Sequence, residues 1–294
     1  MQNIQAAATS SAATRPRAIA RPRLVATLIT YVLLVAGSIV MLIPLIWMVS
    51  TALKPQNEVF TFPPQLIPSR FVWSNFLDGW TILPFNTYLK NTLIIVTNNV
   101  VGNLVSCSLA AFAFSRMRSR FRGVCFALML STMMIPQQVT LIPTFILFKY
   151  LGWVNTLKAL TVPAWFGWPF FIFLLRQFFM TLPRDLDDAA RMDGCSTFRI
   201  FWSIILPLAK PALATVAIFS FMANWNDFLA PLIYLNSPDK FTLALGLLLF
   251  QGQYYTNFPQ MMAVSLLVLL PLLVVFFVAQ NLFIRGIALT GMKG

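Results

Sequence analysis

The sequence predicts an all-α integral membrane protein with about six transmembrane helices. Hydrophobic residues make up 59% of its 294 positions and charged residues only 10%, a balance far outside that of soluble domains. Several apolar runs reach the roughly 20 residues that a helix needs to cross a bilayer. Between the fourth and fifth runs lies a polar segment that holds four of the eight acidic residues. We expect this segment to be a loop with a function of its own.

The predicted elements follow from these runs in order. Residues 1–23 are rich in Ala, Ser and Thr and contain several arginines, which predicts a disordered basic tail on the cytoplasmic side. Residues 24–294 are expected to form a single transmembrane domain. Its six predicted spans are Leu24–Val49, Leu93–Phe114, Val124–Phe148, Leu160–Phe179, Ala212–Leu235 and Met261–Ile284. Because the first span is longer than the roughly 7–15-residue core of a signal peptide, we expect it to remain as an anchor.

The distribution of basic residues predicts the orientation in the membrane. Most of the 21 Lys and Arg residues lie in the tail, in the segments 116–122 and 176–210, and near the C-terminus. The positive-inside rule therefore places both termini and the polar segment in the cytoplasm, in a multi-pass protein of the plasma or inner membrane. We interpret the arginines between 116 and 122 as orientation and lipid-headgroup residues. This distribution argues against a nucleic-acid partner despite the net charge of +13.

The composition excludes several kinds of chemistry in this chain. It has no histidine, which removes Ser-His and Cys-His catalytic pairs and any His-ligated metal. The three cysteines, Cys107, Cys125 and Cys195, are too scattered to suggest a disulfide framework or a metal site. No Gly-rich loop followed by Lys-Ser or Lys-Thr is present, so we expect no ATP phosphates to bind here. We therefore expect neither a cofactor nor an enzyme activity in this chain.

The polar segment Thr181–Pro211 predicts two short helices separated by a turn. Aspartates in the first helical turn complement the helix dipole, and Asp187 is spaced for an ion pair with Arg191. Gly194 marks the end of the first helix, and Ser196 or Thr197 can cap the second, which Pro207 ends. Two adjacent alanines, at 189 and 190, would let an exposed helix face approach another backbone closely, with charge-assisted bonds from the aspartates. The segment therefore predicts a docking plug.

The same segment resembles the cytoplasmic EAA loop of the membrane subunits of ATP-binding-cassette importers. It reads Asp188-Ala189-Ala190-Arg191-Met192-Asp193-Gly194, with Phe201 and Leu206-Pro207 following at the family's spacing. Asp188 stands where the family has a glutamate, whose side chain is one methylene longer. Other stretches look like the maltose-type carbohydrate-uptake branch: Phe173–Phe179, Trp225–Phe228, Met261–Ala263 and Arg285–Gly286. The resemblance covers most of residues 24–294.

The resemblance implies a permease subunit of an ATP-driven, binding-protein-dependent importer for a sugar or related polyol. The implied partners are a homologous second permease subunit, a dimer of ATPase subunits that holds ATP and Mg, an extracellular solute-binding protein and the lipid bilayer. The residues implied to couple to the ATPase are Asp188, Ala189, Ala190, Asp193, Gly194 and Phe201. The outer-loop residues implied to contact the binding protein are Gln251, Gly252, Gln253 and Tyr254. Their amides and aromatic rings would also suit carbohydrate or the membrane interface.

Polar side chains in the fifth apolar run are candidates for the translocation path. Asn224, Asn226 and Asp227 interrupt this run. An aspartate at the centre of a membrane helix costs about 2.5–3.5 kcal/mol on insertion scales, so Asp227 should face protein or a watery passage. The two asparagines and Asp227 either line the path or hydrogen-bond helices to one another.

Other polar residues lie in the second and third runs. Gln137 and Gln138 directly follow a proline, where a bend is expected, and we favour a path-lining or gating role for them. For Asn98, Asn99 and Asn103 helix packing is the favoured interpretation.

Two other classes of protein are alternatives to this interpretation. A self-sufficient secondary transporter or channel would use Asp227 for ion coupling, but it leaves the polar segment without a purpose. A membrane-embedded enzyme would need paired catalytic groups, whereas the sequence offers no histidine and a lone intramembrane carboxylate.

Overall fold

The computed structural model describes residues 21–250 and 257–291, and every regular element in these ranges is helical. The elements are α1 (Arg21–Ala52), η1 (Gln56–Glu58), α2 (Ser74–Ile82), α3 (Phe85–Arg116), α4 (Arg122–Thr132), α5 (Gln137–Tyr150), α6 (Lys158–Thr161), η2 (Val162–Phe166), α7 (Pro169–Thr181), α8 (Asp185–Met192), α9 (Thr197–Ile200), η3 (Phe201–Ile205), α10 (Leu206–Leu208), α11 (Lys210–Trp225), α12 (Leu229–Tyr234), η4 (Pro238–Lys240), α13 (Leu243–Leu248) and α14 (Phe258–Gly291). The predicted all-α class is confirmed. The predicted binding-protein contacts Gln251, Gly252, Gln253 and Tyr254 lie outside the described residues.

The chain divides into two units, residues 1–47 and 48–294. The described part of the first unit is most of α1. The apolar stretch Val25–Ala52 is long enough to cross a bilayer, and its apolar side chains are exposed along most of its length. Apolar surface of this kind is what lipid or a partner helix covers in a membrane.

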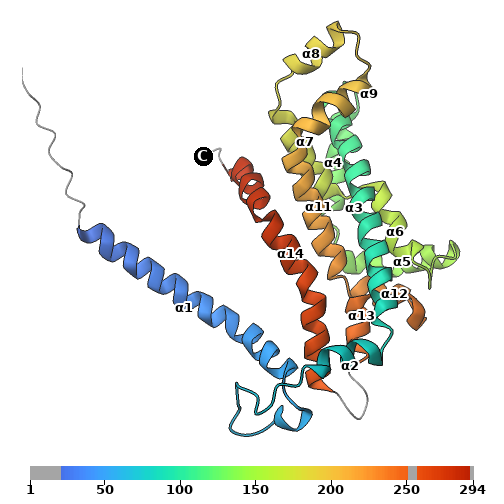
Figure 1. Ribbon diagram of the computed structural model, residues 1–294. Coiled ribbons are helices and arrows are strands. Elements are labelled where there is room, and N and C mark those ends of the chain that lie inside the picture. Colours follow the sequence, from blue (N-terminus) through green and yellow to red (C-terminus); the bar gives the residue numbers. More distant parts are fainter. Residues whose placement is uncertain (1–20, 251–256, 292–294) are drawn as a thin grey trace, which may run out of the picture. The chain divides into compact units, whose positions relative to one another are not determined.

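In the second unit α3 is the central helix. α7 and α11 pack along it, and α14 packs against α11 and α2 (Figure 1). Where α3, α7 and α11 meet, the buried side chains include Cys107, Ala111, Leu175, Phe179 and Val216. A second buried cluster, near the beginning of α3, includes Phe85, Tyr88, Trp225, Leu243 and Val264. α3 is therefore held by packed side chains from its first turn to its last.

Two glycines permit close helix contacts in the second unit. A Cβ atom on Gly246 would lie 2.4 Å from the ring of Tyr88, and one on Gly79 would lie 2.9 Å from a methyl group of Val264. These distances are shorter than any ordinary carbon contact. The approach of α13 to α3 and of α2 to α14 thus requires residues without a side chain.

Among the described residues, four helical segments are long and apolar enough to cross a membrane. They are Val25–Ala52, Phe85–Arg116, Lys158–Thr181 and Phe258–Gln280. Two bent helix pairs bring the number to as many as six if each pair counts as one span. The predicted number of about six spans is reached only with these bent pairs.

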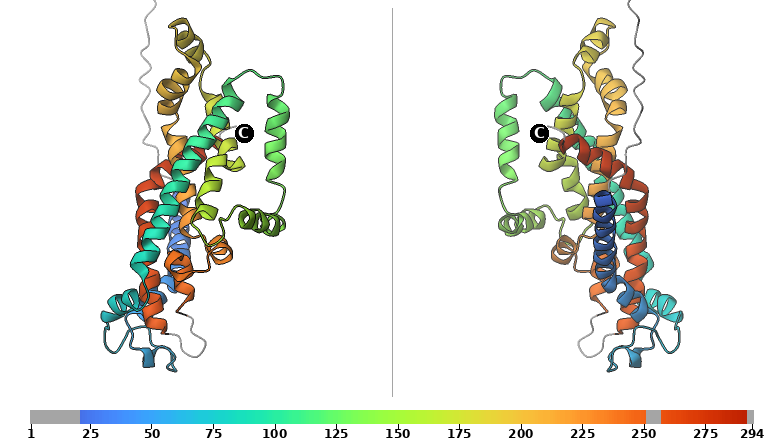
Figure 2. Two further views of the ribbon diagram at one scale, coloured as in Figure 1. Left: turned by 90° about the vertical axis from the view of Figure 1, so that its right-hand side faces the viewer. Right: turned by 90° about the vertical axis from the view of Figure 1, so that its left-hand side faces the viewer.

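The prediction of one continuous third span, Val124–Phe148, is wrong. α4 and α5 meet at an angle of 98°, and Figure 2 shows α5 lying across the direction of α4. Pro136 directly precedes α5 in an extended conformation, with φ −60° and ψ 135°. Because proline has no amide hydrogen and disfavours helical geometry in the residue before it, the helix breaks here.

The prediction of one continuous fifth span, Ala212–Leu235, is also wrong. α11 ends at Trp225, and α12 begins at Leu229 after a break over residues 226–228. At its other end α11 is bent by 79° from the helical segment Thr197–Leu208. The fourth predicted span contains an interruption too, since Gly167 has a φ of 85° between η2 and α7.

Candidate functional site

The polar segment folds as the predicted helix-turn-helix, formed by α8 and α9. Gly194 has a φ of 77°, and its amide donates to the Arg191 carbonyl (3.0 Å). The Cys195 amide donates to the Ala190 carbonyl (2.9 Å), which completes the pair of bonds typical of a glycine-terminated helix. Ser196 then caps α9, because its Oγ accepts from the Arg199 amide (3.3 Å). We call residues 181–208 the docking segment.

The second helix of the docking segment extends further than predicted. α9 continues through the wider turns of η3 and ends after α10 at Leu208, so Pro207 lies within the helix and does not end it. Pro207 directly follows the wider turn of η3, which the bond from the Leu206 amide to the Phe201 carbonyl closes, so its missing amide hydrogen falls where the helical hydrogen-bond pattern changes. The bend to α11 follows at Ala209.

The structure separates the two adjacent alanines that were predicted to share an exposed face. Ala189 is exposed, but Ala190 is only 6% exposed and packs in the cluster formed with α3 and α7. Neighbouring helix positions are about 100° apart, so one alanine can be exposed while the next faces the bundle. Phe201 is also buried, and its ring lies 5.2 Å from that of Phe112. Ala190 and Phe201 therefore support the segment from inside, contrary to the expectation of direct partner contact.

The exposed surface of the docking segment combines acidic and apolar groups. Asp188, Ala189, Asp193 and Gly194 are exposed, as predicted for a docking surface. Three large apolar side chains are exposed beside them: Met192, Phe198 and Trp202, the last two with stacked rings 6.4 Å apart. Figure 1 shows α8 and α9 standing at one end of the bundle. Such a surface suits a partner that offers a cleft with basic and apolar groups.

Asp187 does not form the predicted ion pair with Arg191. Its Oδ2 instead accepts from Nη1 of Arg116 at 3.0 Å, with both side chains less than a tenth exposed. Arg191 pairs weakly with Asp188, at 3.8 Å on the surface. The interpretation of Arg116 as a lipid-headgroup residue is therefore wrong. Local spacing could not reveal this pair, because its two members lie 71 positions apart.

The asparagines of α3 hold helices together, as predicted. Asn103 donates to the Ser220 hydroxyl on α11 (3.0 Å), and Asn99 donates to the Leu160 carbonyl (2.9 Å). Asn98 accepts from the Trp165 indole (3.0 Å). These bonds fasten α3 to α11 and to the segment of α6 and η2.

Asn224 belongs to the same hydrogen-bond network. Its Oδ1 accepts from the side-chain amide of Asn99, and its own side-chain Nδ2 donates to the Ser220 carbonyl. Asn99, Asn103, Ser220 and Asn224 together form what we call the α3–α11 network. Of the two interpretations open for Asn224, the geometry favours helix packing over a free position on the path.

The two polar residues that follow Asn224 lie at the end of α11. Asn226 is exposed and donates to the Met222 carbonyl of its own helix (2.9 Å). Asp227 is half-buried in the break before α12, and its Oδ1 accepts from the Ala230 amide (3.2 Å). Within the described part of the chain, Asp227 forms no ion pair. Its carboxylate therefore acts as a cap for the first turn of α12.

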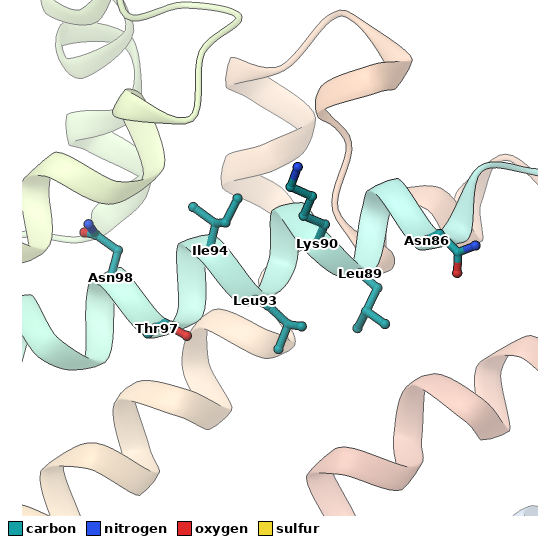
Figure 3. A pocket seen from close by; sticks show the side chains of 7 residues that line it. All are labelled: Asn86, Leu89, Lys90, Leu93, Ile94, Thr97 and Asn98. Atoms are coloured by element: carbon teal, nitrogen blue, oxygen red, sulfur yellow. The ribbon is translucent and has the colours of Figure 1, made fainter.

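The remaining predicted path residues lie elsewhere. Gln137 and Gln138 open α5 at the bend after α4, and both side chains are exposed. A shallow hollow runs along one helix, α3, and Figure 3 shows the side chains that line it. They are Asn86, Leu89, Lys90, Leu93, Ile94, Thr97 and Asn98. Sequence reasoning singled out only Asn98 of these, because a single Lys or Thr in an apolar run gives little signal.

Comparison with known proteins gives a consistent result. Residues 102–288 match the family described as "Binding-protein-dependent transport system inner membrane component". A "Putative ABC transporter permease protein ORF2" from Caldicellulosiruptor sp. is 36% identical over 268 residues, 90% of this chain and 96% of the relative. The "Arabinooligosaccharides transport system permease protein AraQ" of Halalkalibacterium halodurans is 35% identical over 85% of this chain and 91% of its own length.

Two further similarities extend this comparison. The "sn-glycerol-3-phosphate transport system permease protein UgpE" of Pectobacterium atrosepticum is 33% identical over 88% of this chain and 94% of the relative. Among solved structures, a chain of a bacterial ABC transporter involved in the import of alginate superposes with a TM-score of 0.81 and 24% identity. That likeness covers 90% of this chain and 99% of the other, and it concerns the fold.

Proposed function

This chain belongs to the family of binding-protein-dependent transport system inner membrane components, as a permease subunit of an ABC importer, and we propose that it imports a sugar or a related polyol. The proposal for the cargo rests on the relatives, whose names include an arabinooligosaccharide and a glycerol-phosphate system. The chain's own polar side chains, amides and hydroxyls, are groups that bind sugar hydroxyls.

The proposed partners follow from what the chain itself lacks. Its sequence contains no phosphate-binding Gly-rich loop, so ATP and Mg would be held by a pair of separate ATPase subunits. A homologous second permease subunit would complete the passage, and an extracellular solute-binding protein would deliver the cargo. The shallow hollow beside α3, lined by Lys90, Thr97 and Asn98 among others, is the proposed face toward the passage.

The observation that carries the proposed coupling is the exposed surface of the docking segment. Asp188 and Asp193 would bond to basic groups of the ATPase, while Ala189 and Gly194 allow close backbone approach. Met192, Phe198 and Trp202 supply the apolar contact area. This end of the bundle, together with both termini, would lie in the cytoplasm, as the basic residues indicate.

The alternative of a self-sufficient transporter that uses Asp227 gains no support. The carboxylate of Asp227 caps a helix and does not stand free in the bundle. An ion-coupled mechanism would also leave the exposed surface of the docking segment unexplained.

The test is purification of the chain from its native membrane in mild detergent. An ATPase subunit should co-purify with the wild-type chain and be lost with Gly194→Val, because valine cannot adopt the φ of 77° without strain and the turn would reshape. The control is Gly123→Val, at an exposed glycine with open space around it and an ordinary φ. A wild-type chain that moves solute in vesicles with no ATPase attached would overturn the proposal.

A further inference from the structure

α8, the first helix of the docking segment, is joined to the bundle by few side chains. Of its eight residues, two are buried: Asp187 and Ala190. The views in Figures 1 and 2 agree that α8 lies at the end of the bundle and not along it. A force on the exposed face of α8 must therefore pass into the bundle through these two residues or along the chain.

The buried partner of Asp187 joins three elements at one point. Arg116 is the last residue of α3, and its Nη1 donates to Asp187 of α8. Its Nη2 donates to the carbonyls of Phe179 (2.7 Å) and Leu182 (2.8 Å), at the end of α7. One guanidinium thus fixes the end of α3, the end of α7 and α8 together. Arginine suits this task because its planar fork presents several donors in fixed directions.

Stability alone is a poor explanation for this pair. A buried ion pair often contributes less to stability than well-packed apolar side chains of similar volume. Among the described protein atoms, Nε of Arg116 and Oδ1 of Asp187 have no hydrogen-bond partner, so the pair is not optimised even as an ion pair. What such a pair does well is resist separation, because pulling it apart leaves two uncompensated charges in a buried place.

The helix at the other end of this link is the one that organises the bundle. α3 packs along α7 and α11, and the α3–α11 network lies in its middle. A displacement of its last turn would therefore reach α7 and α11, and with them the hollow along α3 that faces the proposed passage.

We infer that the Arg116–Asp187 pair is the link through which a displacement of α8 is transmitted to α3. Both are positioning residues, since neither lies on the proposed docking surface. The inference rests on the proposed function, in which the docking segment couples this chain to the ATPase, and it takes closure of the ATPase pair on ATP as the source of the displacement. It predicts that α8 and the end of α3 move as one body, and that breaking the pair separates ATPase binding from movement of the bundle.

The first experiment breaks the pair in the complete complex, purified with its ATPase subunits in a cysteine-free background. Spin labels at exposed Val105 of α3, outside the hollow, and at exposed Val274 of α14 report the distance between these two helices, with and without ATP plus vanadate. In the wild type we expect the distance between the two labels to change on addition of ATP plus vanadate. The change should be absent in Asp187→Asn and present again in Asp187→Glu. Arg116→Gln should behave like Asp187→Asn, whereas Arg118→Gln, at an exposed arginine of the same segment, should respond fully.

The outcomes separate the two proposals. The proposed function itself would be wrong if no ATPase subunit co-purified with the wild type, or if its label distance did not change on addition of ATP plus vanadate. A full response in Asp187→Asn, with the ATPase still bound, would defeat the inference alone.

A second measurement leaves the pair intact and covers the case in which these variants fail to assemble. Labels at exposed Asp185 of α8, which lies outside the proposed contact surface, and at exposed Arg118, just beyond α3, should keep one distance throughout the ATP cycle. A distance that changes on addition of ATP plus vanadate would show that α8 and α3 move separately, which the inference does not allow.

Discussion

In the docking segment most charged side chains face outward, whereas in the α3–α11 network polar side chains face one another. Asp188 and Asp193 are exposed and available to a partner. Asn99, Asn103 and Asn224 form hydrogen bonds to neighbouring helices. The two regions are polar for different reasons. One presents its groups to another chain, and the other uses them to fasten helices where lipid offers no hydrogen bonds.

Asp187 shows that both kinds of polar residue, those facing a partner and those joining helices, occur within one helix. It lies in the docking segment by sequence, but its buried contact with Arg116 places it with the fastening residues. Its neighbour Asp188 is exposed and only weakly paired. Adjacent aspartates in one motif therefore serve different purposes, and substitutions can measure the difference.

The largest effect is expected for Arg116→Ala. Removing one partner of a buried ion pair leaves the other charge without compensation, which typically costs about 3–5 kcal/mol of the free energy of unfolding. Chemical denaturation in detergent should show this loss. Arg118→Ala, at an exposed arginine two positions on, should change the free energy of unfolding by at most about 0.5 kcal/mol.

A double variant sharpens the same point. Arg116→Met combined with Asp187→Leu replaces both charges by apolar side chains, and it should recover most of the lost stability. If the double variant were as unstable as Arg116→Ala, the ion pair would contribute more to stability than the apolar side chains that replace it. The view that this pair serves positioning rather than stability would then be wrong.

The next effect is expected for Gly194→Val, which tests the turn that presents the docking surface. A residue other than glycine at a φ of 77° costs about 1–3 kcal/mol. Hydrogen exchange should show faster exchange of the Cys195 amide, whose bond to Ala190 closes the turn. Asn tolerates this conformation better than valine, so the Cys195 amide should exchange more slowly in Gly194→Asn than in Gly194→Val.

Local patterns in the sequence predicted much of the docking segment, but not its connections. The Gly194 turn and the Ser196 cap depend on neighbouring residues, and both were found as predicted. The Arg116–Asp187 pair depends on how α3 and α8 meet, which no local pattern contains. The same holds for Ala190, which is buried because of the direction in which α8 faces.

In the membrane-spanning part, composition predicted the spans better than their shape. Apolar runs showed where helices lie, since length and hydrophobicity decide this. The breaks at Pro136 and at residues 226–228 lie within runs that are apolar overall, so the sequence predicted two unbroken spans, although Pro136 indicated a bend and Asn226 and Asp227 interrupt the fifth run. Likewise, an asparagine in a span can fasten helices or line a path, and only its partners decide between these uses.

Within the α3–α11 network we expect smaller effects than at Arg116. Asn103→Leu removes the bond to the Ser220 hydroxyl, and such bonds between membrane helices average about 0.6 kcal/mol, with a maximum near 1.7. Ser220→Ala should have a similar effect, and a double-mutant cycle should show that the two are coupled. Additive effects of the two substitutions would mean that the bond contributes nothing to stability.

The smallest effect is expected for Arg191→Gln, at the exposed ion pair with Asp188. The atoms are 3.8 Å apart and both side chains are more than half exposed, so the pair should contribute no more than about 0.2–1 kcal/mol to the free energy of unfolding. Because salt screens exposed charges, this contribution should vanish at high ionic strength, while the loss caused by Arg116→Ala should persist. Denaturation of both variants at low and high salt measures this. Equal salt dependence would mean that Asp187 and Asp188 stand in similar surroundings, and the distinction between the two faces of α8 would be lost.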